Sequence, residues 1–193
     1  MVQWLIVSWF AGILISGYEP HDRLTWFLEV APVFIVAPVL YFTRSRFPLP
    51  RYIIIWIWLH GIVLMIGGHY TYAEVPIGFW VQHAFDLSRN HFDRLGHLLQ
   101  GFVPALVVRE ILVRRKIVNG AGWVFFLTLT VCMAFSVTYE FIEWVSALIL
   151  GQGADAFLGT QGDPWDTQWD MFLATVGATL AQILHRRSGI LDG

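Results

Sequence analysis

The sequence predicts an all-α fold, a polytopic membrane helical bundle of six transmembrane helices plus an interfacial amphipathic helix. Apolar residues make up 56% of the 193 residues and charged residues only 13%, about half of the ~25% that is usual in soluble domains. The chain also holds ten Trp and fifteen Phe, and aromatic rings collect where a membrane meets water. This composition argues against a disordered chain and against an ordinary soluble domain.

Six apolar stretches are long enough, or nearly so, to cross about 30 Å of hydrocarbon, which takes roughly 20 residues of helix. They cover about residues 4–17, 24–42, 52–68, 91–113, 122–150 and 171–185. The first stretch is short, but no basic segment precedes it and no small-x-small cleavage site follows it. It is therefore interpreted as a membrane anchor rather than a removed signal. The connections are too short for a second domain, so residues 1–193 are predicted to form a single integral-membrane domain.

The segment from about residue 77 to residue 90 is too short and too polar to cross a membrane. Its apolar residues Ile77, Trp80, Val81 and Ala84 follow the i, i+3, i+4, i+7 spacing of one helix face. Such a helix lies in the membrane interface. We expect it to form a lid or rim on the outer side.

Basic residues orient the predicted spans, because short cytoplasmic loops carry an excess of Lys and Arg. Nine of the twelve Lys and Arg residues fall between spans two and three, in or just after the last part of span four, or after span six. This distribution predicts that both termini are cytoplasmic.

Two further function classes are excluded by composition. The net charge of −2 leaves no basic field that would attract nucleic acid, so no nucleic-acid partner is expected. The single cysteine, Cys132, excludes an intrachain disulfide and a Cys-rich zinc site.

With this topology, most acidic and several His residues lie at the outer ends of the spans, and three segments concentrate them. Residues Asp93, His97 and Gln100 share one helix face at i, i+4 and i+7. Glu140 and Glu143, three residues apart, also share a face. The third segment is the loop of residues 159–170, which leads into span six and places its last residue, Asp170, where an N-cap is expected.

Ionisable groups inside a bilayer are costly unless they are paired, hydrated or bound to a metal ion. Arg94 and His97 are the expected partners of the two glutamates. The candidate catalytic residues are His97, Glu140, Glu143 and Arg94, and the candidate ligands of a divalent metal ion are Asp93, Asp163, Asp166 and Asp170. Carboxylate oxygens suit Mg²⁺ or Ca²⁺, and an added imidazole allows Zn²⁺, Mn²⁺ or Fe.

Structural explanations of the same residues stay open. Asp93 and Asp170 can be helix N-caps, His97 can be a hydrogen-bonded core residue, and the glutamates can form a structural ion pair with Arg94. Small residues in the sixth span, namely Ala174, Gly177, Ala178 and Ala181, predict a close helix contact. The same small-residue face could equally serve a homo-oligomer.

Three motifs give the chain a resemblance to known families. They are Asp93-Arg94-Leu-Gly-His97-Leu-Leu-Gln, Tyr139-Glu140-Phe-Ile-Glu143-Trp and Gly159-Thr-Gln-Gly-Asp163-Pro-Trp-Asp166-Thr-Gln-Trp-Asp170. They closely resemble the YjdF family of bacterial inner-membrane proteins, which implies a location in the inner membrane and an architecture rather than an activity. The order Asp-Arg-x-x-His, Glu-x-x-Glu and a later Asp is also similar to VanZ-like membrane proteins. That weaker resemblance implies envelope lipids or cell-wall precursors, although Glu143 stands where Gln is usual.

Three functions fit these observations. The first is an enzyme acting on membrane lipid head groups or lipid-linked precursors, with Glu140 or His97 as the base, Arg94 holding a phosphate and the loop aspartates holding a metal ion. The second is a binder or carrier of a lipid, another ligand or a cation. The third is a structural factor of envelope assembly, in which the polar cluster only joins helices.

Overall fold

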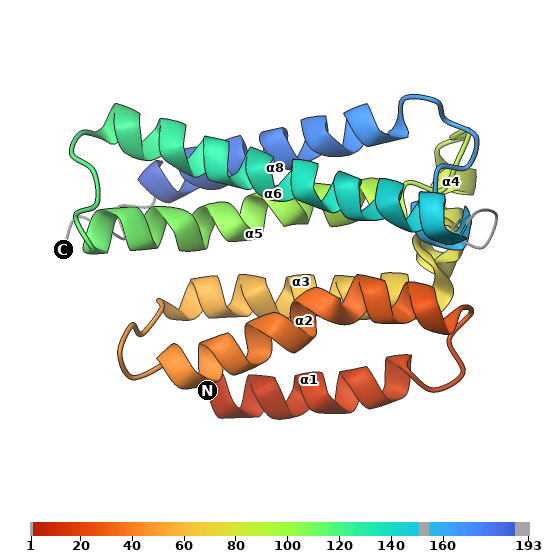
Figure 1. The fold of residues 1–193 in the computed structure, drawn as a ribbon, viewed down its shortest axis with the longest axis horizontal. Helices are drawn as coiled ribbons and strands as arrows, with labels where there is room; N and C mark the ends of the chain where they lie inside the picture. Colours follow the sequence, from red (N-terminus) through yellow and green to blue (C-terminus); the bar gives the residue numbers. More distant parts are fainter. Residues whose placement is uncertain (1, 151–154, 188–193) are drawn as a thin grey trace. The chain divides into compact units, whose positions relative to one another are not determined.

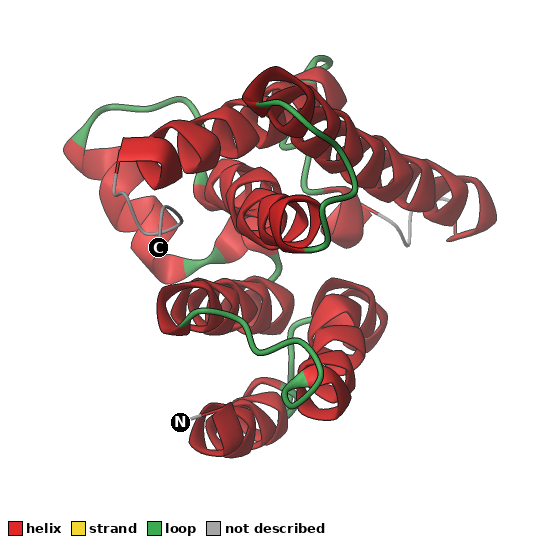
Figure 2. Ribbon diagram, turned by 90° about the vertical axis from the view of Figure 1, so that its left-hand side faces the viewer, coloured by secondary structure: helices red, strands yellow, loops and turns green. Residues whose placement is uncertain are grey.

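The computed structural model describes residues 2–150 and 155–187, and within these ranges all regular structure is helical (Figure 2). The predicted all-α class is therefore confirmed. The chain divides into two compact units. The first comprises Met1–Gly96 and Glu143–Pro164, and the second comprises His97–Ile142 and Trp165–Gly193.

The first unit is built on three long helices, in which α1 (Val2–Ser16) and α2 (Arg23–Thr43) pack against α3 (Arg51–Tyr70), with α2 running opposite to the other two (Figure 1). The short elements η1 (Tyr72–Glu74), α4 (Pro76–Ala84) and α7 (Asp155–Leu158) complete the unit together with the first turn of α5 (Phe92–Arg114) and the helical residues 143–150. Two prolines lie inside α2, which a helix in a bundle tolerates because its neighbours satisfy the freed backbone groups.

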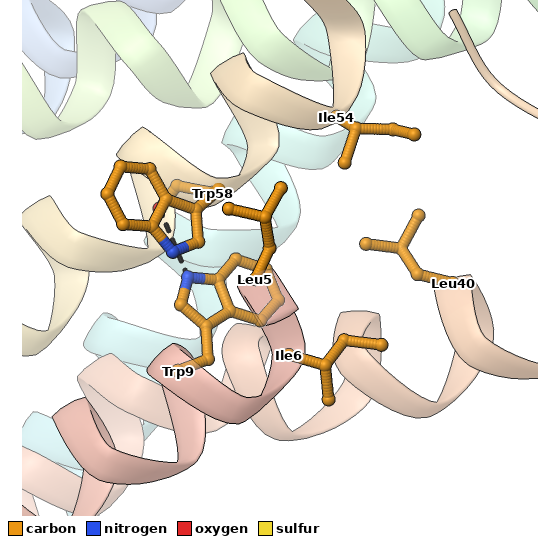
Figure 3. A pocket seen from close by; sticks show the side chains of 6 residues that line it. All are labelled: Leu5, Ile6, Trp9, Leu40, Ile54 and Trp58. Carbon is orange, nitrogen blue, oxygen red and sulfur yellow. Dashed lines mark hydrogen bonds between the residues drawn. The ribbon is translucent and has the colours of Figure 1, made fainter. Parts of the chain in front are cut away.

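Two tryptophans join α1 to α3. The Trp9 indole Nε1 donates to the carbonyl oxygen of Trp58 at 3.1 Å, and the Trp58 indole donates to Ser8 Oγ at 2.8 Å. Gly61 leaves room for the Trp9 ring, since a Cβ there would meet the indole. The two rings line a small apolar pocket with Leu5, Ile6, Leu40 and Ile54 (Figure 3). The first apolar stretch is thus a helix packed into its unit, and its assignment as a membrane anchor stays a prediction.

The second unit contains the remainder of α5, the part of α6 (Ala121–Leu150) up to Ile142, and α8 (Asp166–Arg187) (Figure 1). Helices α5 and α8 approach so closely that a Cβ on Gly101 would overlap the Ala174 carbonyl, and a Cβ on Gly177 would overlap the Leu98 carbonyl. Ala174, with Gly177 on the same face, is almost fully buried. The close contact predicted from small residues in the sixth span is therefore confirmed.

Among the described residues, four helices are long and apolar enough to cross a membrane, namely α2, α3, α5 and residues Ala121–Ile149 of α6, and α1 supplies a shorter apolar helix. Many large apolar side chains on these helices face outward instead of into a core, among them Trp4, Phe10, Phe42, Phe126 and Leu148. An outward apolar surface of this kind is typical of helices that contact lipid.

Some predicted boundaries were wrong. The helix expected over residues 77–90 is α4 and ends at Ala84. Helix α8 begins at Asp166, so Asp170 lies one turn inside it instead of at the N-cap. Asp93 is the second residue of α5, and the first amide of that helix, Phe92 N–H, donates instead to Asn90 Oδ1 at 3.0 Å.

The apolar face predicted for α4 is present and points outward. Ile77, Trp80 and Val81 are exposed, while Gly78 is buried against the Asn90 side chain. Because these apolar side chains are exposed, this face of α4 suits contact with the interfacial part of a membrane.

Candidate functional site

In the second unit, one histidine lies between two carboxylates from different helices. The Nδ1 atom of His97 is 3.9 Å from Glu140 Oε1, and its Nε2 atom is 3.9 Å from Asp170 Oδ2. All three side chains are buried, with His97 6% and Asp170 2% exposed. The predicted pairing of His97 with Glu140 is thus present, and Asp170 joins it.

The close packing of α5 on α8 explains why these residues meet. Asp170 lies one turn before Ala174, and His97 lies one turn before Gly101, the residue that touches the Ala174 backbone. Small residues at this contact let the helices approach, so the longer side chains one turn earlier reach each other. The Tyr139 ring packs edge-on against the imidazole, with 6.2 Å between ring centroids.

The hydrogen bond to Gln100 orients the imidazole. The Nδ1 atom lies 3.0 Å from Gln100 Oε1, an oxygen that can only accept. With a proton on Nδ1, a neutral His97 presents the lone pair of Nε2 toward the Asp170 carboxylate. In that tautomer, a proton or a metal ion between the two acceptors would satisfy both. The separation of 3.9 Å is too long for a direct hydrogen bond and slightly longer than the roughly 3.3 Å between two ligand atoms of a tetrahedral Zn²⁺ site.

Two further predicted ligands lie one helical turn from this cluster along the chain. Asp166 opens α8 one turn before Asp170 and is buried. Asp93 precedes His97 by one turn of α5, is also buried, and belongs to the first unit.

The other predicted residues lie in the first unit, where an aspartate meets two arginines. Arg94 Nη2 donates to Asp163 Oδ2 at 2.9 Å, and Arg89 Nη1 lies 3.5 Å from the same oxygen. Arg89 is almost fully buried. Sequence reasoning missed Arg89, although a basic residue on the predicted outer side just before a span was an available signal. The assignment of Asp163 as a metal ligand stays a prediction.

Polar contacts hold the loop that carries Asp163. Asn90 N–H donates to Gln161 Oε1 at 3.0 Å, and Gln161 Nε2 donates back to the Asn90 carbonyl at 2.9 Å. Arg89 Nη2 donates to the Gly159 carbonyl at 3.1 Å. Gly159 and Gly162 have φ angles of 58° and 82°, which glycine adopts without strain. The loop is therefore fixed onto the start of α5.

The pKa of His91 depends on the charges of the neighbouring Arg89, Arg94 and Asp163 side chains. Burial lowers the pKa of His91, the charges of Arg94 and Arg89 lower it further, and Asp163 opposes them. At His91, the charges of the two guanidinium groups and of the Asp163 carboxylate therefore act in opposite directions.

A second buried group in the first unit centres on Tyr72, which sequence reasoning also missed. Its ring fits against Gly67 and Gly96, and a Cβ on Gly96 would lie 2.8 Å from the ring. Burial raises the pKa of Tyr72 well above its usual value, and the charges of three buried carboxylates, Glu29, Asp93 and Glu143, raise it further. Tyr72 therefore stays a neutral phenol beside the predicted catalytic residue Glu143.

Comparison with known families matches residues 1–189 to the family described as "Predicted membrane protein (DUF2238)". The chain belongs to this family. It is also 54% identical over 189 residues to the inner membrane protein YjdF of Escherichia coli (strain K12). The aligned region covers 94% of this chain and 90% of the relative. The predicted resemblance to YjdF is confirmed. No solved structure matches the chain.

Proposed function

We propose that this chain is an inner-membrane protein with six spans, α1, α2, α3, α5, α6 and α8, and with both termini in the cytoplasm. The distribution of Lys and Arg among the loops supports this orientation. The four long apolar helices and the name of the E. coli relative support the location. In this topology the His97 cluster and the Arg89–Arg94–Asp163 site lie toward the outer face.

We further propose that the protein is a metal-dependent enzyme that acts on the phosphate-containing head groups of membrane lipids or lipid-linked precursors. The observation that carries this proposal is the buried His97 imidazole with a carboxylate beside each ring nitrogen. A buried His that faces Asp is a common basis for binding Zn²⁺ or Mn²⁺.

In this proposal each residue of the His97 cluster has a separate role. His97 and Asp170 would hold the metal ion, and Asp93 and Asp166 are further candidate ligands one turn away on each helix. A metal ion held there would lower the pKa of bound water toward neutrality. Glu140 would act as the general base.

The arginine site supplies affinity for the substrate phosphate. Arg89 and Arg94 both lie against the Asp163 carboxylate, and guanidinium groups bind phosphate through charge-assisted hydrogen bonds. The pair of arginines also favours the second candidate function, a non-catalytic protein that binds anionic lipids.

Elemental analysis of the detergent-purified protein tests the metal site. We expect a stoichiometric divalent metal in the wild type and its loss in His97→Gln and Asp170→Asn. The matched control replaces the exposed residues His83 and Asp86 with Gln and Asn and should keep the metal. Absence of metal from the wild type after incubation with Zn²⁺ and Mn²⁺ would reject the metal-dependent mechanism.

Turnover separates the two candidate functions. The purified protein is incubated with vesicles containing phosphatidylglycerol and phosphatidylethanolamine, and released head groups are measured with and without a chelator. Release that Glu140→Gln abolishes supports the enzyme. Binding to the vesicles that Arg94→Gln weakens, without any release, supports the lipid-binding protein instead.

A further inference from the structure

Helix α6 carries a row of small polar side chains into the interior of the second unit. Thr128, Cys132 and Ser136 follow one another at intervals of four residues and lead to Glu140, so they share one face of the helix. Thr128 is 0% exposed, and Cys132 and Ser136 are each 1% exposed. The row therefore runs along the inside of the helix bundle.

The hydroxyl groups in this row differ from the other hydroxyl groups of the same unit. The more exposed Thr130 and Thr138 donate to their own helix, at Phe126 O and Ala134 O, with distances of 2.9 and 2.7 Å. Buried Thr128 Oγ1 and Ser136 Oγ have no hydrogen-bond partner among the residues that the structure describes. Hydroxyl groups in membrane helices usually donate to a carbonyl oxygen of the preceding turn, whereas those of Thr128 and Ser136 do not.

Helix α8 adds a third buried acceptor on the same side. Gln182 is 2% exposed, and its Nε2 donates to the Phe125 carbonyl of α6 at 3.3 Å. Its Oε1 has no hydrogen-bond partner within the described part of the chain. Buried polar groups without protein partners typically bind ordered water.

At its other end, this row reaches a second group of charged residues, as counting along α5, α6 and α8 shows. Counting twelve residues from His97, Glu140 and Asp170 toward the other end of the unit leads to Arg109, Thr128 and Gln182, about 18 Å along the helices. Glu110 is buried there and accepts from Arg114 Nη1 at 3.1 Å. The His185 ring interacts electrostatically with Arg109 and Glu110.

From this placement we propose that the second unit holds a file of water molecules along Ser136, Thr128 and Gln182, which conducts protons between the level of Glu140 in α6 and Glu110 at the inner end. Hydroxyl and amide oxygens that accept and relay hydrogen bonds are suited to such a file, and polar residues inside membrane bundles mark ion and proton paths. The inference rests on the proposed six-span topology but not on the metal site.

Proton flux into reconstituted vesicles tests the proposal. The full-length protein is placed in vesicles that contain a trapped pH-sensitive dye, and a potassium diffusion potential drives proton entry. We expect flux well above that of protein-free vesicles, and a decrease of about tenfold or more, equivalent to a higher barrier, in the Thr128→Val/Ser136→Ala variant. The matched control, Thr130→Val/Thr138→Val, removes two hydroxyls that bond to their own helix and should conduct like the wild type.

The outcomes decide the proposal in both directions. Wild-type flux equal to that of protein-free vesicles overturns it, as does equal flux in the two double variants. Should the first double variant fail to fold, Gln182→Met removes the third acceptor with little change in shape and must also lower the flux. Because these substitutions leave His97 and Asp170 in place, metal content measured on the same preparations shows separately whether the proposed metal site survives.

Discussion

Gly177 of α8 lies directly against the backbone carbonyl of Leu98 in α5, so that no side chain fits between the two helices. Leu98 directly follows His97 on α5, and Gly177 belongs to the small-residue face that follows Asp170 on α8. The geometry of the candidate site therefore depends on a residue that takes no part in its chemistry.

Gly177→Ala should destabilise the protein by about 1–3 kcal/mol, because the added Cβ must push apart two backbones in a packed interior. Thermal unfolding in detergent measures this effect. Gly122→Ala is the control, since no atom lies within 4 Å of a Cβ placed there, and it should be neutral or slightly stabilising. Equal stability of the two variants would contradict the close contact.

Arg94→Gln should raise the pKa of His91, because the charge of Arg94 disfavours protonation of the imidazole. Removing a positive neighbour stabilises the charged form of a histidine. NMR titration of the protein labelled at histidine measures the change. Arg115→Gln, on the loop predicted to face the cytoplasm, should leave His91 unaffected, and Asp163→Asn should lower the pKa, since that carboxylate acts in the opposite direction.

Asp22→Ala should cost about 1 kcal/mol, because the Asp22 side chain caps α2 by accepting from Thr25 N–H at 2.7 Å. That hydrogen bond lowers the pKa of Asp22 below its usual value of 3.8. A lowered carboxyl pKa contributes stability above the unfolded-state value and loses it as the pH falls through the folded-state value. The difference between wild type and Asp22→Ala, measured by unfolding in detergent, should therefore shrink in acid, whereas Asp22→Asn should keep most of the cap at every pH.

Labelling from the two sides of the membrane tests the proposed orientation. In a Cys132→Ala background, an impermeant maleimide should label Glu74→Cys in spheroplasts, because the η1 segment is predicted to lie outside. Arg46→Cys, in the loop after α2, should be labelled only once the membrane is opened. Both positions are exposed, so access to the reagent depends on the side of the membrane. The reverse pattern would show that the basic loops lie outside.

The long helices could be predicted because their signals are local. An apolar stretch such as residues 52–68 forms a helix in any membrane arrangement, since the backbone must satisfy its own hydrogen bonds there. Boundaries were less predictable. The loop before span six contains no apolar stretch that distinguishes turn from helix, and α8 begins at Asp166, four residues before the expected cap.

The sequence by itself determined the membrane class, the apolar helices and the concentration of ionisable residues in three segments. Only the tertiary structure decided which of these residues meet. Arg94 and Asp163 lie 69 residues apart along the chain, and neither residue indicates its partner locally. His97 meets Asp170 because glycines bring α5 and α8 together, and Arg89 and Tyr72 became visible as site residues only through burial. Spacing along one helix predicts which residues share a face, whereas a pairing between helices is set by packing.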